Sequence, residues 1–285
     1  MTTRVREPAD FRRACEDARA GSSKVGLVPT MGALHEGHFS LIDEAKQRAD
    51  FVAVTIFVNP LQFGPGEDLD RYPRTLESDL AGCRERGVDL VFAPDPGSMY
   101  PAQFQTQVSI EELTKPLEGE CRPAHFDGVT TVVAKLFNLA GPCAAMFGRK
   151  DYQQWKILSR MAHDLDMPIE VVGCPIVREL DGLALSSRNR YLSASERKRA
   201  LGIASGLRRA HGAWCEGERS PDMLRSLAEE PVQLEFDRVD YVAAVDPETL
   251  VTSAESPSRL LIAVAAHLGA TRLIDNVVVG EDPRP

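Results

Sequence analysis

The sequence has little that would indicate a membrane, a secreted scaffold or a nucleic-acid partner. None of its 285 residues belongs to an apolar run that approaches the length of a membrane span. Basic side chains are outnumbered 33 to 42, and the resulting net charge of −9 disfavours nucleic acid as a partner. The first residues lack the apolar segment of a secretion signal. We therefore expect a cytoplasmic protein with no membrane and no nucleic acid among its partners.

Closely spaced cysteines and the two commonest nucleotide-binding fingerprints are also missing. The six cysteines are scattered and form no CxxC pair, which is typical of reduced thiols and not of a disulfide framework. The sequence contains no G-x-G-x-x-G after a predicted strand and no G-x-x-x-x-G-K-[ST]. Any nucleotide must therefore be held by another device.

Apolar residues make up 43% of the chain, and their spacing predicts alternating strands and helices over its first part. Predicted strands cover residues 24–28, 51–57, 88–92, 144–147 and 169–174. Predicted helices cover residues 8–20, 75–86, 129–139 and 152–165, and a further helix begins between residues 35 and 38. Residues 94–100 and 113–128 are predicted to be irregular. This order predicts a doubly wound parallel α/β sheet whose ligands lie beyond the carboxyl ends of its strands.

The pattern changes after about residue 176. A polar loop at residues 185–192 precedes one predicted helix, residues 193–214, which starts with a capping-box-like Ser-Ala-Ser-Glu. Predicted strands follow at residues 239–245, 259–266 and 271–279. We therefore divide the chain into a larger domain, residues 1–176, and a smaller α+β domain, residues 177–285.

Residues 29–40, PTMGALHEGHFS, join a buried strand to a helix and form the most informative stretch. A helix N-terminus attracts anions, and Gly32 and Gly37 allow the backbone to approach a ligand closely. His35 and His38 could donate hydrogen bonds to a polyphosphate. One alternative is zinc, although the HExxH motif spaces its histidines by four residues and this pair is spaced by three. The other alternative is a pair of histidines that only caps the helix.

Four further polar clusters accompany this stretch: Asn59 with Gln62, Arg122 with His125, Lys150 with Asp151, and the loop from Ser186 to Arg190. A lysine at the start of a helix, such as Lys150, is unfavourable for the helix dipole unless an anion binds there. The hydroxyls and guanidinium groups of the loop can bind phosphates. Each cluster alone could be an ordinary surface loop. Together they indicate a site for phosphate and carboxylate groups.

Several of these segments resemble motifs of the pantothenate synthetase (pantoate–β-alanine ligase) family. PTMGALHEGH resembles its variant of the HIGH motif, and residues 185–188 resemble its counterpart of KMSKS. The resemblance also covers IFVNPLQF, YPRT, RPAHF, FGRKDYQQ and SSRNRYL, and more weakly TRLIDN. It implies the modified Rossmann (HUP-like) fold of the nucleotidyltransferase superfamily, with the smaller domain as a hinged lid, and a homodimer.

The resemblance also implies a reaction. Members of the family are ATP- and Mg²⁺-dependent ligases that join D-pantoate to β-alanine through an enzyme-bound pantoyl adenylate, releasing AMP and pyrophosphate. Two alternatives stay open: a related nucleotidyltransferase that leaves a stable adenylylated product, and a nucleotide-binding module without catalysis.

Roles are implied for the positions that match the family. The implied catalytic residues are His35, His38, Lys150 and Arg188. The implied ATP-binding residues are Pro29, Thr30, Met31, His35, Gly37, His38, Phe147, Gly148, Lys150, Asp151, Val177, Leu185, Ser186, Ser187 and Arg188. The implied pantoate-binding residues are Met31, Asn59, Gln62, Tyr72, Arg122 and Gln154, and Asp79 is the implied Mg²⁺ ligand. The sequence departs from the family at Ser78, where an acidic residue is common, at Arg149, often glutamate, and at Leu185, often methionine.

Overall fold

The chain forms two compact units in a computed structural model that describes residues 2–252 and 258–285. The first unit comprises Met1–Thr114, Arg122–Arg149 and Gln154–Pro175. The second comprises Lys115–Cys121, Lys150–Gln153 and Ile176–Pro285, so it includes two short segments from within the predicted larger domain.

The first unit is built on a six-stranded sheet. Its strands are β1 (Thr3–Val5), β2 (Val25–Thr30), β3 (Phe51–Ile56), β4 (Leu90–Phe92), β5 (Cys143–Gly148) and β6 (Ile169–Cys174). They lie in the order β1-β4-β3-β2-β5-β6, and every neighbouring pair is parallel. The predicted doubly wound sheet is therefore confirmed. Its strand order reverses between β2 and β5, and this reversal is the switch point at which such sheets bind ligands.

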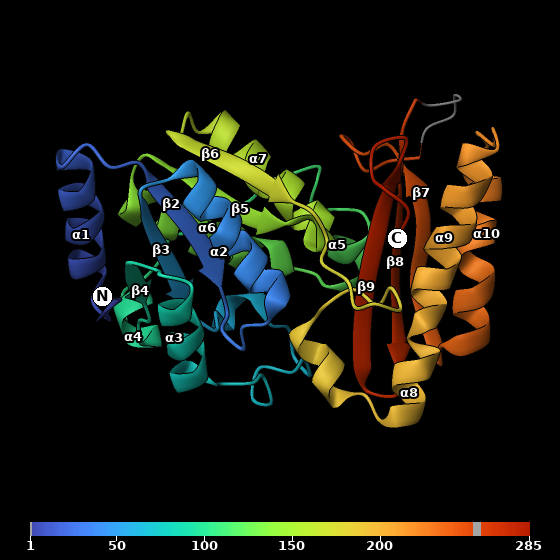
Figure 1. Cartoon of the computed structure of the whole chain (residues 1–285), viewed down its shortest axis with the longest axis horizontal. Helices are drawn as coiled ribbons and strands as arrows, with labels where there is room; N and C mark the ends of the chain where they lie inside the picture. The colour runs from blue at the N-terminus through green and yellow to red at the C-terminus, as the bar shows by residue number, and fades with distance from the viewer. Residues whose placement is uncertain (1, 253–257) are drawn as a thin grey trace. The chain divides into compact units, whose positions relative to one another are not determined.

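Helices cover both faces of this sheet (Figure 1). They are α1 (Pro8–Ala20), α2 (Glu36–Arg48), α3 (Leu76–Glu85), α4 (Pro96–Met99), α6 (His125–Ala140) and α7 (Tyr152–Asp164). Neighbouring residues of a strand point to opposite faces, so Leu27 packs with residues of α1, α6 and α7 while Val28 packs with residues of α2 and α3. A strand covered on both faces must be largely apolar, which is why the continuous apolar runs predicted β2 to β6 correctly. Strand β1, with the sequence TRV, has no such run and has no predicted counterpart.

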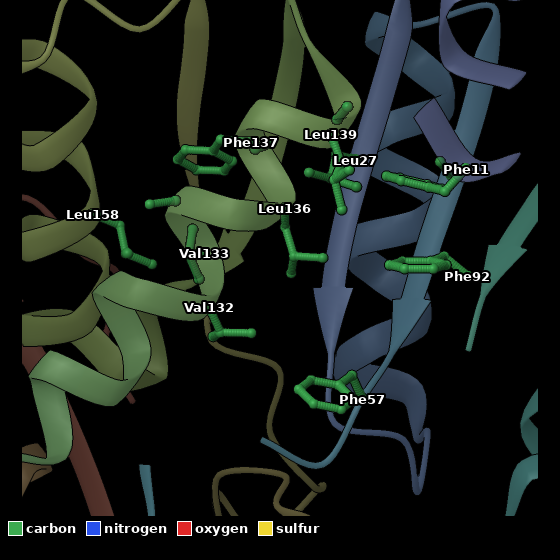
Figure 2. Close-up of a cluster of buried hydrophobic side chains, with 14 of the residues drawn as sticks. Phe11, Leu27, Phe57, Phe92, Val132, Val133, Leu136, Phe137, Leu139 and Leu158 are labelled. Atoms are coloured by element: carbon green, nitrogen blue, oxygen red, sulfur yellow. The ribbon is translucent and has the colours of Figure 1, made fainter. Parts of the chain in front are cut away.

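Aromatic side chains fill the core on the α1 and α6 face. The ring of Phe11 stacks on that of Phe92, with centroids 4.6 Å apart and planes inclined by 14°. Figure 2 shows this stack beside Leu27 of β2, with Leu136 and Phe137 of α6 in the same cluster. Burial of these large side chains is the main stabilising term for the unit.

The second unit is a small α+β structure, as predicted. Its antiparallel sheet has the order β7-β8-β9, formed by β7 (Arg238–Val245), β8 (Leu260–Leu268) and β9 (Thr271–Val279). Its helices are α5 (Glu118–Cys121), α8 (Ala194–Arg199), α9 (Leu201–Cys215) and α10 (Pro221–Glu235). Alternate residues of β8 pack with α9 and α10 in one apolar core. No helix in the described parts of either unit is long and apolar enough to cross a membrane.

Some predictions of local structure are wrong. Residues 113–128 are not wholly irregular, because they contain α5 and the first turn of α6, and residues 94–100 contain α4. Gly128 suggested a break in the helix, but it serves close packing: a Cβ there would lie 2.2 Å from the carbonyl oxygen of Leu61. A backbone approach this close requires glycine.

Two helices of the second unit also differ from prediction. The helix predicted at residues 193–214 is interrupted at Ala200 and forms α8 and α9, although the capping box of Ser193 and Glu196 is confirmed. The apolar periodicity runs through this single turn residue and gives no sign of it. Helix α10 has no predicted counterpart, and it contains a proline, Pro231. Its signals were the cap Ser220 and a proline at the first helical position.

We expect Phe92→Ala to lower the free energy of unfolding of the first unit by about 3–5 kcal/mol, because it removes the stacked ring and leaves a cavity. Urea denaturation followed by Trp155 fluorescence in a Trp214→Phe background would measure this effect, since Trp155 and Trp214 are the two tryptophans. The exposed Leu165 offers a control within the same unit, and Leu165→Ala should change stability by less than about 0.5 kcal/mol. Equal losses for both variants would contradict this account of the core.

Candidate active site

The connection between β2 and α2 carries the predicted histidine motif and lies at the switch point of the sheet. Strand β2 ends at Thr30, whose hydroxyl donates to the carbonyl oxygen of Thr55 (2.7 Å) and accepts from the N–H of Gly32 (3.1 Å). The segment from Met31 to His38 is the histidine bend. The two hydrogen bonds of Thr30 tie the start of this bend to the end of β3. Open α/β sheets bind their ligands in this position.

A buried carboxylate shapes the bend. Asp79 of α3 is 2% exposed, and its Oδ2 and Oδ1 accept hydrogen bonds from the N–H groups of Ala33 (3.0 Å) and Leu34 (2.9 Å). The hydroxyl of Thr75 also donates to this carboxylate, at 3.1 Å from Oδ1. Hydrogen bonds to an ionised acceptor are stronger than those between neutral groups. Asp79 therefore holds two successive amides of the bend in place.

The backbone of the bend adopts an unusual conformation to meet Asp79. Gly32 and Ala33 both have positive φ angles, +82° and +51°. A Cβ on Gly32 would lie 3.0 Å from Asp79 Oδ2 and 3.1 Å from a methyl carbon of Ile56, so glycine suits both the angle and the space. Ala33 adopts the left-handed conformation at a cost of about 1–2 kcal/mol, which its hydrogen bond to Asp79 offsets.

His35 and His38 cap α2 reciprocally. Nδ1 of His35 accepts from the N–H of Gly37 (3.1 Å), and Nδ1 of His38 accepts from the N–H of His35 (3.4 Å). The two ring centroids lie 4.2 Å apart. A nitrogen that accepts from a backbone N–H carries no proton, so the proton of each neutral ring is on Nε2. The capping role considered as an alternative is therefore present, and it turns both rings into Nε2–H donors beside a helix N-terminus, where anions are favoured.

Gln62 lies in a 3₁₀ turn (Pro60–Gln62) that follows β3. It is 9% exposed, and its Nε2 donates to Sδ of Met31 in the bend (3.0 Å). Asn59 precedes this turn, is 1% exposed, and donates through Nδ2 to Gln62 Oε1 (3.1 Å). The structure thus brings together three of the predicted pantoate-binding residues, Met31, Asn59 and Gln62. Asn59 is less exposed than Gln62.

Arg122 and His125 hold the backbone of Gln62. His125 Nδ1 donates to the carbonyl oxygen of Gln62 at 2.7 Å, and Arg122 Nη2 approaches the same oxygen at 3.4 Å. Arg122 also forms a bidentate pair with Glu67, at 2.8 and 2.7 Å. Burial alone would raise the pKa of Glu67, but the hydrogen bond and charge of Arg122 outweigh it and lower that pKa. Arg122 therefore anchors the loop that carries Gln62.

Of the other predicted site residues of the first unit, Tyr72 lies in the loop before α3, and Phe147, Gly148 and Gln154 lie at strand and helix ends. Tyr72 is buried, with its ring edge-on to that of Phe63 at 6.0 Å. Phe147 is also buried, and its ring packs against Phe137 of the core, so only its backbone is suited to a ligand contact. Gly148 ends β5, and Gln154 lies in the first turn of α7.

The predicted phosphate-binding loop belongs to the second unit. The N–H of Leu185 donates to the carbonyl oxygen of Val177 (3.0 Å), which brings these two predicted residues together. Ser186 caps a 3₁₀ turn, Ser187–Tyr191, by accepting from the N–H of Arg188 (3.2 Å). Arg188 is therefore the second residue of a capped turn, and local hydrogen bonds set its backbone conformation.

Two neighbouring residues of β9 anchor this part of the second unit. Asp275 accepts a bidentate pair from Arg178, at 2.5 and 2.9 Å, beside the loop that leads to Leu185. Asn276 donates to the backbone carbonyl of Lys150 (2.8 Å). Sequence reasoning noted the segment TRLIDN only as a weak match. The signal was the adjacent Asp-Asn pair on a strand that is otherwise largely apolar.

A second buried ion network holds residues 115–121 on the sheet of their unit. Glu118 accepts a bidentate pair from Arg272, with both distances 2.7 Å, and the hydroxyl of Tyr241 (2.8 Å). Arg272 also donates to Asp240 (2.7 Å). Burial would raise the pKa of Asp240, but hydrogen bonds from Arg272 and His267 lower it overall. Sequence reasoning missed this network, because its members are separated by up to 154 positions.

Metal-binding side chains do not cluster in the described residues: no group of three or more His, Cys, Asp or Glu could hold an ion there. The oxygens of Asp79, the implied Mg²⁺ ligand, already accept from two amides and a hydroxyl. The residues present thus fit a protein-held Mg²⁺ ion poorly.

The sheet order and the histidine bend define a nucleotide-binding protein of the doubly wound α/β class. Comparison with known proteins agrees with this class. The sequence model of the family described as pantoate-beta-alanine ligase matches residues 3–278. The chain therefore belongs to the pantoate–β-alanine ligase family.

Individual relatives match over nearly their whole length. A pantothenate synthetase from Geotalea uraniireducens is 52% identical over 267 residues, which cover 93% of this chain and 95% of the relative. Pantothenate synthetase 1 from Bradyrhizobium diazoefficiens is 50% identical, with 98% and 99% covered. Among solved structures, the Thermus thermophilus protein superposes with a TM-score of 0.92 at 47% identity, covering 97% of this chain and 99% of that one. The Francisella tularensis ligase superposes with a TM-score of 0.80 at 30% identity and full coverage of both chains.

We expect Asp79→Asn to loosen the bend, because one acceptor oxygen becomes an NH₂ group that faces a backbone N–H or the Thr75 hydroxyl. Hydrogen exchange followed by mass spectrometry should show faster exchange, by about tenfold or more, in peptides covering residues 31–38. The exposed neighbour Ser78 supplies the control, and Ser78→Ala should leave exchange unchanged. Unchanged protection in Asp79→Asn would show that the carboxylate does not hold the bend.

Proposed function

We propose that this protein joins D-pantoate to β-alanine at the expense of ATP and releases pantothenate, AMP and pyrophosphate. The observation that carries this proposal is the histidine bend, a capped helix N-terminus with two oriented Nε2–H donors at the switch point of the sheet. Family membership supports it. So does the Francisella tularensis relative, described as complexed with beta-gamma ATP and beta-alanine.

In the first half-reaction, a carboxylate oxygen of pantoate attacks the α-phosphorus of ATP. A bond from that oxygen to phosphorus forms, and the bond from phosphorus to the pyrophosphate oxygen breaks. Negative charge therefore develops on the phosphate oxygens. We assign His35, His38 and the N-terminus of α2 to this charge, and Lys150, Ser186, Ser187 and Arg188 to the outer phosphates. Oriented donors and cations stabilise such charge without a covalent protein nucleophile.

Gln62 and Gln154 are assigned to the hydroxyls and carboxylate of pantoate. Gln62 suits this role because Met31 and Asn59 fix its amide, and Arg122 and His125 hold its backbone. A group held in this way loses little freedom when it binds a substrate.

In the second half-reaction, the amine of β-alanine attacks the acyl carbon of pantoyl adenylate. A C–N bond forms, the bond from carbon to the AMP oxygen breaks, and the amine loses a proton. The protein holds both reactants in line and keeps water from the reactive intermediate.

We further propose that Mg²⁺ binds chiefly through the phosphate oxygens of ATP. This small hard cation keeps several waters and binds phosphates readily. Asp79 is assigned to the bend, where its oxygens have three donors. A homodimer and a cytoplasmic location, expected from the family resemblance and composition, complete the proposal.

We expect the purified protein to release AMP and pyrophosphate together with pantothenate when ATP, Mg²⁺, D-pantoate and β-alanine are supplied. Coupled pyrophosphate detection and chromatography of the nucleotides would measure this directly. Without β-alanine, labelled pyrophosphate should still exchange into ATP, but only when pantoate is present. Release of ADP, or a stable adenylylated product, would overturn the proposal and favour another phosphate-transfer enzyme.

We expect His38→Ala to lower the rate of pantoate-dependent pyrophosphate exchange by about 10²–10³-fold, the usual effect of removing one oriented donor. The histidine His163 of α7 supplies a control, since its side chain is 78% exposed, and His163→Ala should retain full activity. Circular dichroism would establish that both variants are folded. An unchanged rate in folded His38→Ala, with weaker ATP binding only, would favour a nucleotide-binding module without catalysis.

A further inference from the structure

The side chain of Asn59 uses every hydrogen-bonding position that it has. Its Nδ2 donates to Gln62 Oε1 (3.1 Å) and to the carbonyl oxygen of Gly128 (3.0 Å). Its Oδ1 accepts from the hydroxyl of Tyr100 (2.8 Å) and from the N–H of Leu61 (3.3 Å). A primary amide has two donor hydrogens and two acceptor lone pairs, so all four positions are filled.

Two backbone groups determine which way this amide faces. The carbonyl of Gly128 can only accept and therefore requires the NH₂ end of Asn59. The N–H of Leu61 can only donate and therefore requires the oxygen end. If the amide were reversed, its oxygen would face the carbonyl oxygen of Gly128 and its NH₂ group would face the N–H of Leu61. Both contacts would leave buried polar groups unsatisfied, which is costly.

The orientation of the Asn59 amide determines the orientation of the Gln62 amide. Because Asn59 presents an NH₂ hydrogen, Gln62 turns its Oε1 toward Asn59 and its Nε2 toward the bend, where it contacts Met31. Gln62 therefore offers a donor on the side of the histidine bend. A donor suits the oxygens of a hydroxy acid, whereas the opposite orientation would repel a carboxylate.

Tyr100 hydrogen-bonds to the oxygen end of the Asn59 amide. Its ring packs against those of Phe57 and Phe104, at centroid distances of 6.1 and 5.1 Å. Burial raises the pKa of Tyr100, so its hydroxyl stays protonated and donates to Asn59 Oδ1. Nothing in the sequence motifs singled out this residue.

We propose that Tyr100 is a positioning residue for the ligase reaction, acting through Asn59 to fix the amide of Gln62 with its NH₂ end toward pantoate. Gly128 belongs to the same device, because only a glycine lets its helix approach the Leu61–Gln62 turn closely enough for the bond to Asn59. This inference rests on the proposed function, in which Gln62 binds pantoate.

The test is steady-state kinetics of Tyr100→Phe, Asn59→Asp and a matched control, each with pantoate and ATP varied separately. Tyr100→Phe should raise the KM for pantoate by about tenfold, the effect of one buried hydrogen bond, and leave the KM for ATP within about twofold of the wild type. Asn59→Asp should raise the KM for pantoate by about a hundredfold or more, since a carboxylate cannot donate to Gly128 or to Gln62.

Tyr241→Phe is the matched control, because it removes a tyrosine hydroxyl that donates to a buried carboxylate in the second unit. It should lower thermal stability about as much as Tyr100→Phe but leave both KM values unchanged. If Tyr100→Phe alters neither KM, or raises both equally, the inference is wrong. If Asn59→Asp does not fold, the result for Tyr100→Phe decides alone. A wild-type protein without pantoate-dependent exchange would instead overturn the proposed function, so the two failures are distinguishable.

Discussion

The geometry of the candidate site depends on a buried carboxylate that binds backbone N–H groups. Asp79 fixes Ala33 and Leu34, these residues set the path into α2, and that path sets where His35 and His38 stand. A buried charge is costly unless strong hydrogen bonds satisfy it. The bend provides these hydrogen bonds through the N–H groups of Ala33 and Leu34, which would bind water if the loop were free. The same bonds therefore stabilise the charge and order the loop.

The principle recurs wherever the protein must hold an irregular segment. Asn59 binds two backbone groups of neighbouring segments, and Gln153 binds both Glu118 N–H and the carbonyl oxygen of Pro116, at 3.0 and 2.7 Å. Each such bond contributes only about 0.5–1.5 kcal/mol, but removing one partner leaves a buried group unsatisfied at a greater cost. Segments held in this way are irregular in conformation and yet have a single structure, as a site for chemistry requires.

This principle also explains which parts of the fold and the site could be predicted from the sequence. Apolar runs predicted the strands other than β1, and the histidine motif with the loop at residues 185–192 led to the family. Both signals are local. The partners of Asp79 lie 45 and 46 positions away, and Tyr100 lies 41 positions from Asn59, so no spacing rule could pair them. The irregular prediction for residues 113–128 was wrong for a related reason, since Gly128 serves a tertiary contact with the Leu61 backbone and does not break its helix.

Lys150 illustrates why the protein fixes backbone as well as side chains. A lysine at the beginning of a helix opposes the helix dipole, so its position is unfavourable until an anion binds. Asn276 holds the backbone carbonyl of Lys150, and its neighbour Asp275 holds Arg178, so one strand fixes two segments that lead to predicted phosphate-binding residues. The unfavourable position of Lys150 is thereby maintained by the fold and not by the ligand. In the proposed reaction, a Lys150 backbone that is fixed before phosphate charge develops reduces the reorganisation that this cation requires, and such preorganisation is usually the largest single contribution to catalysis.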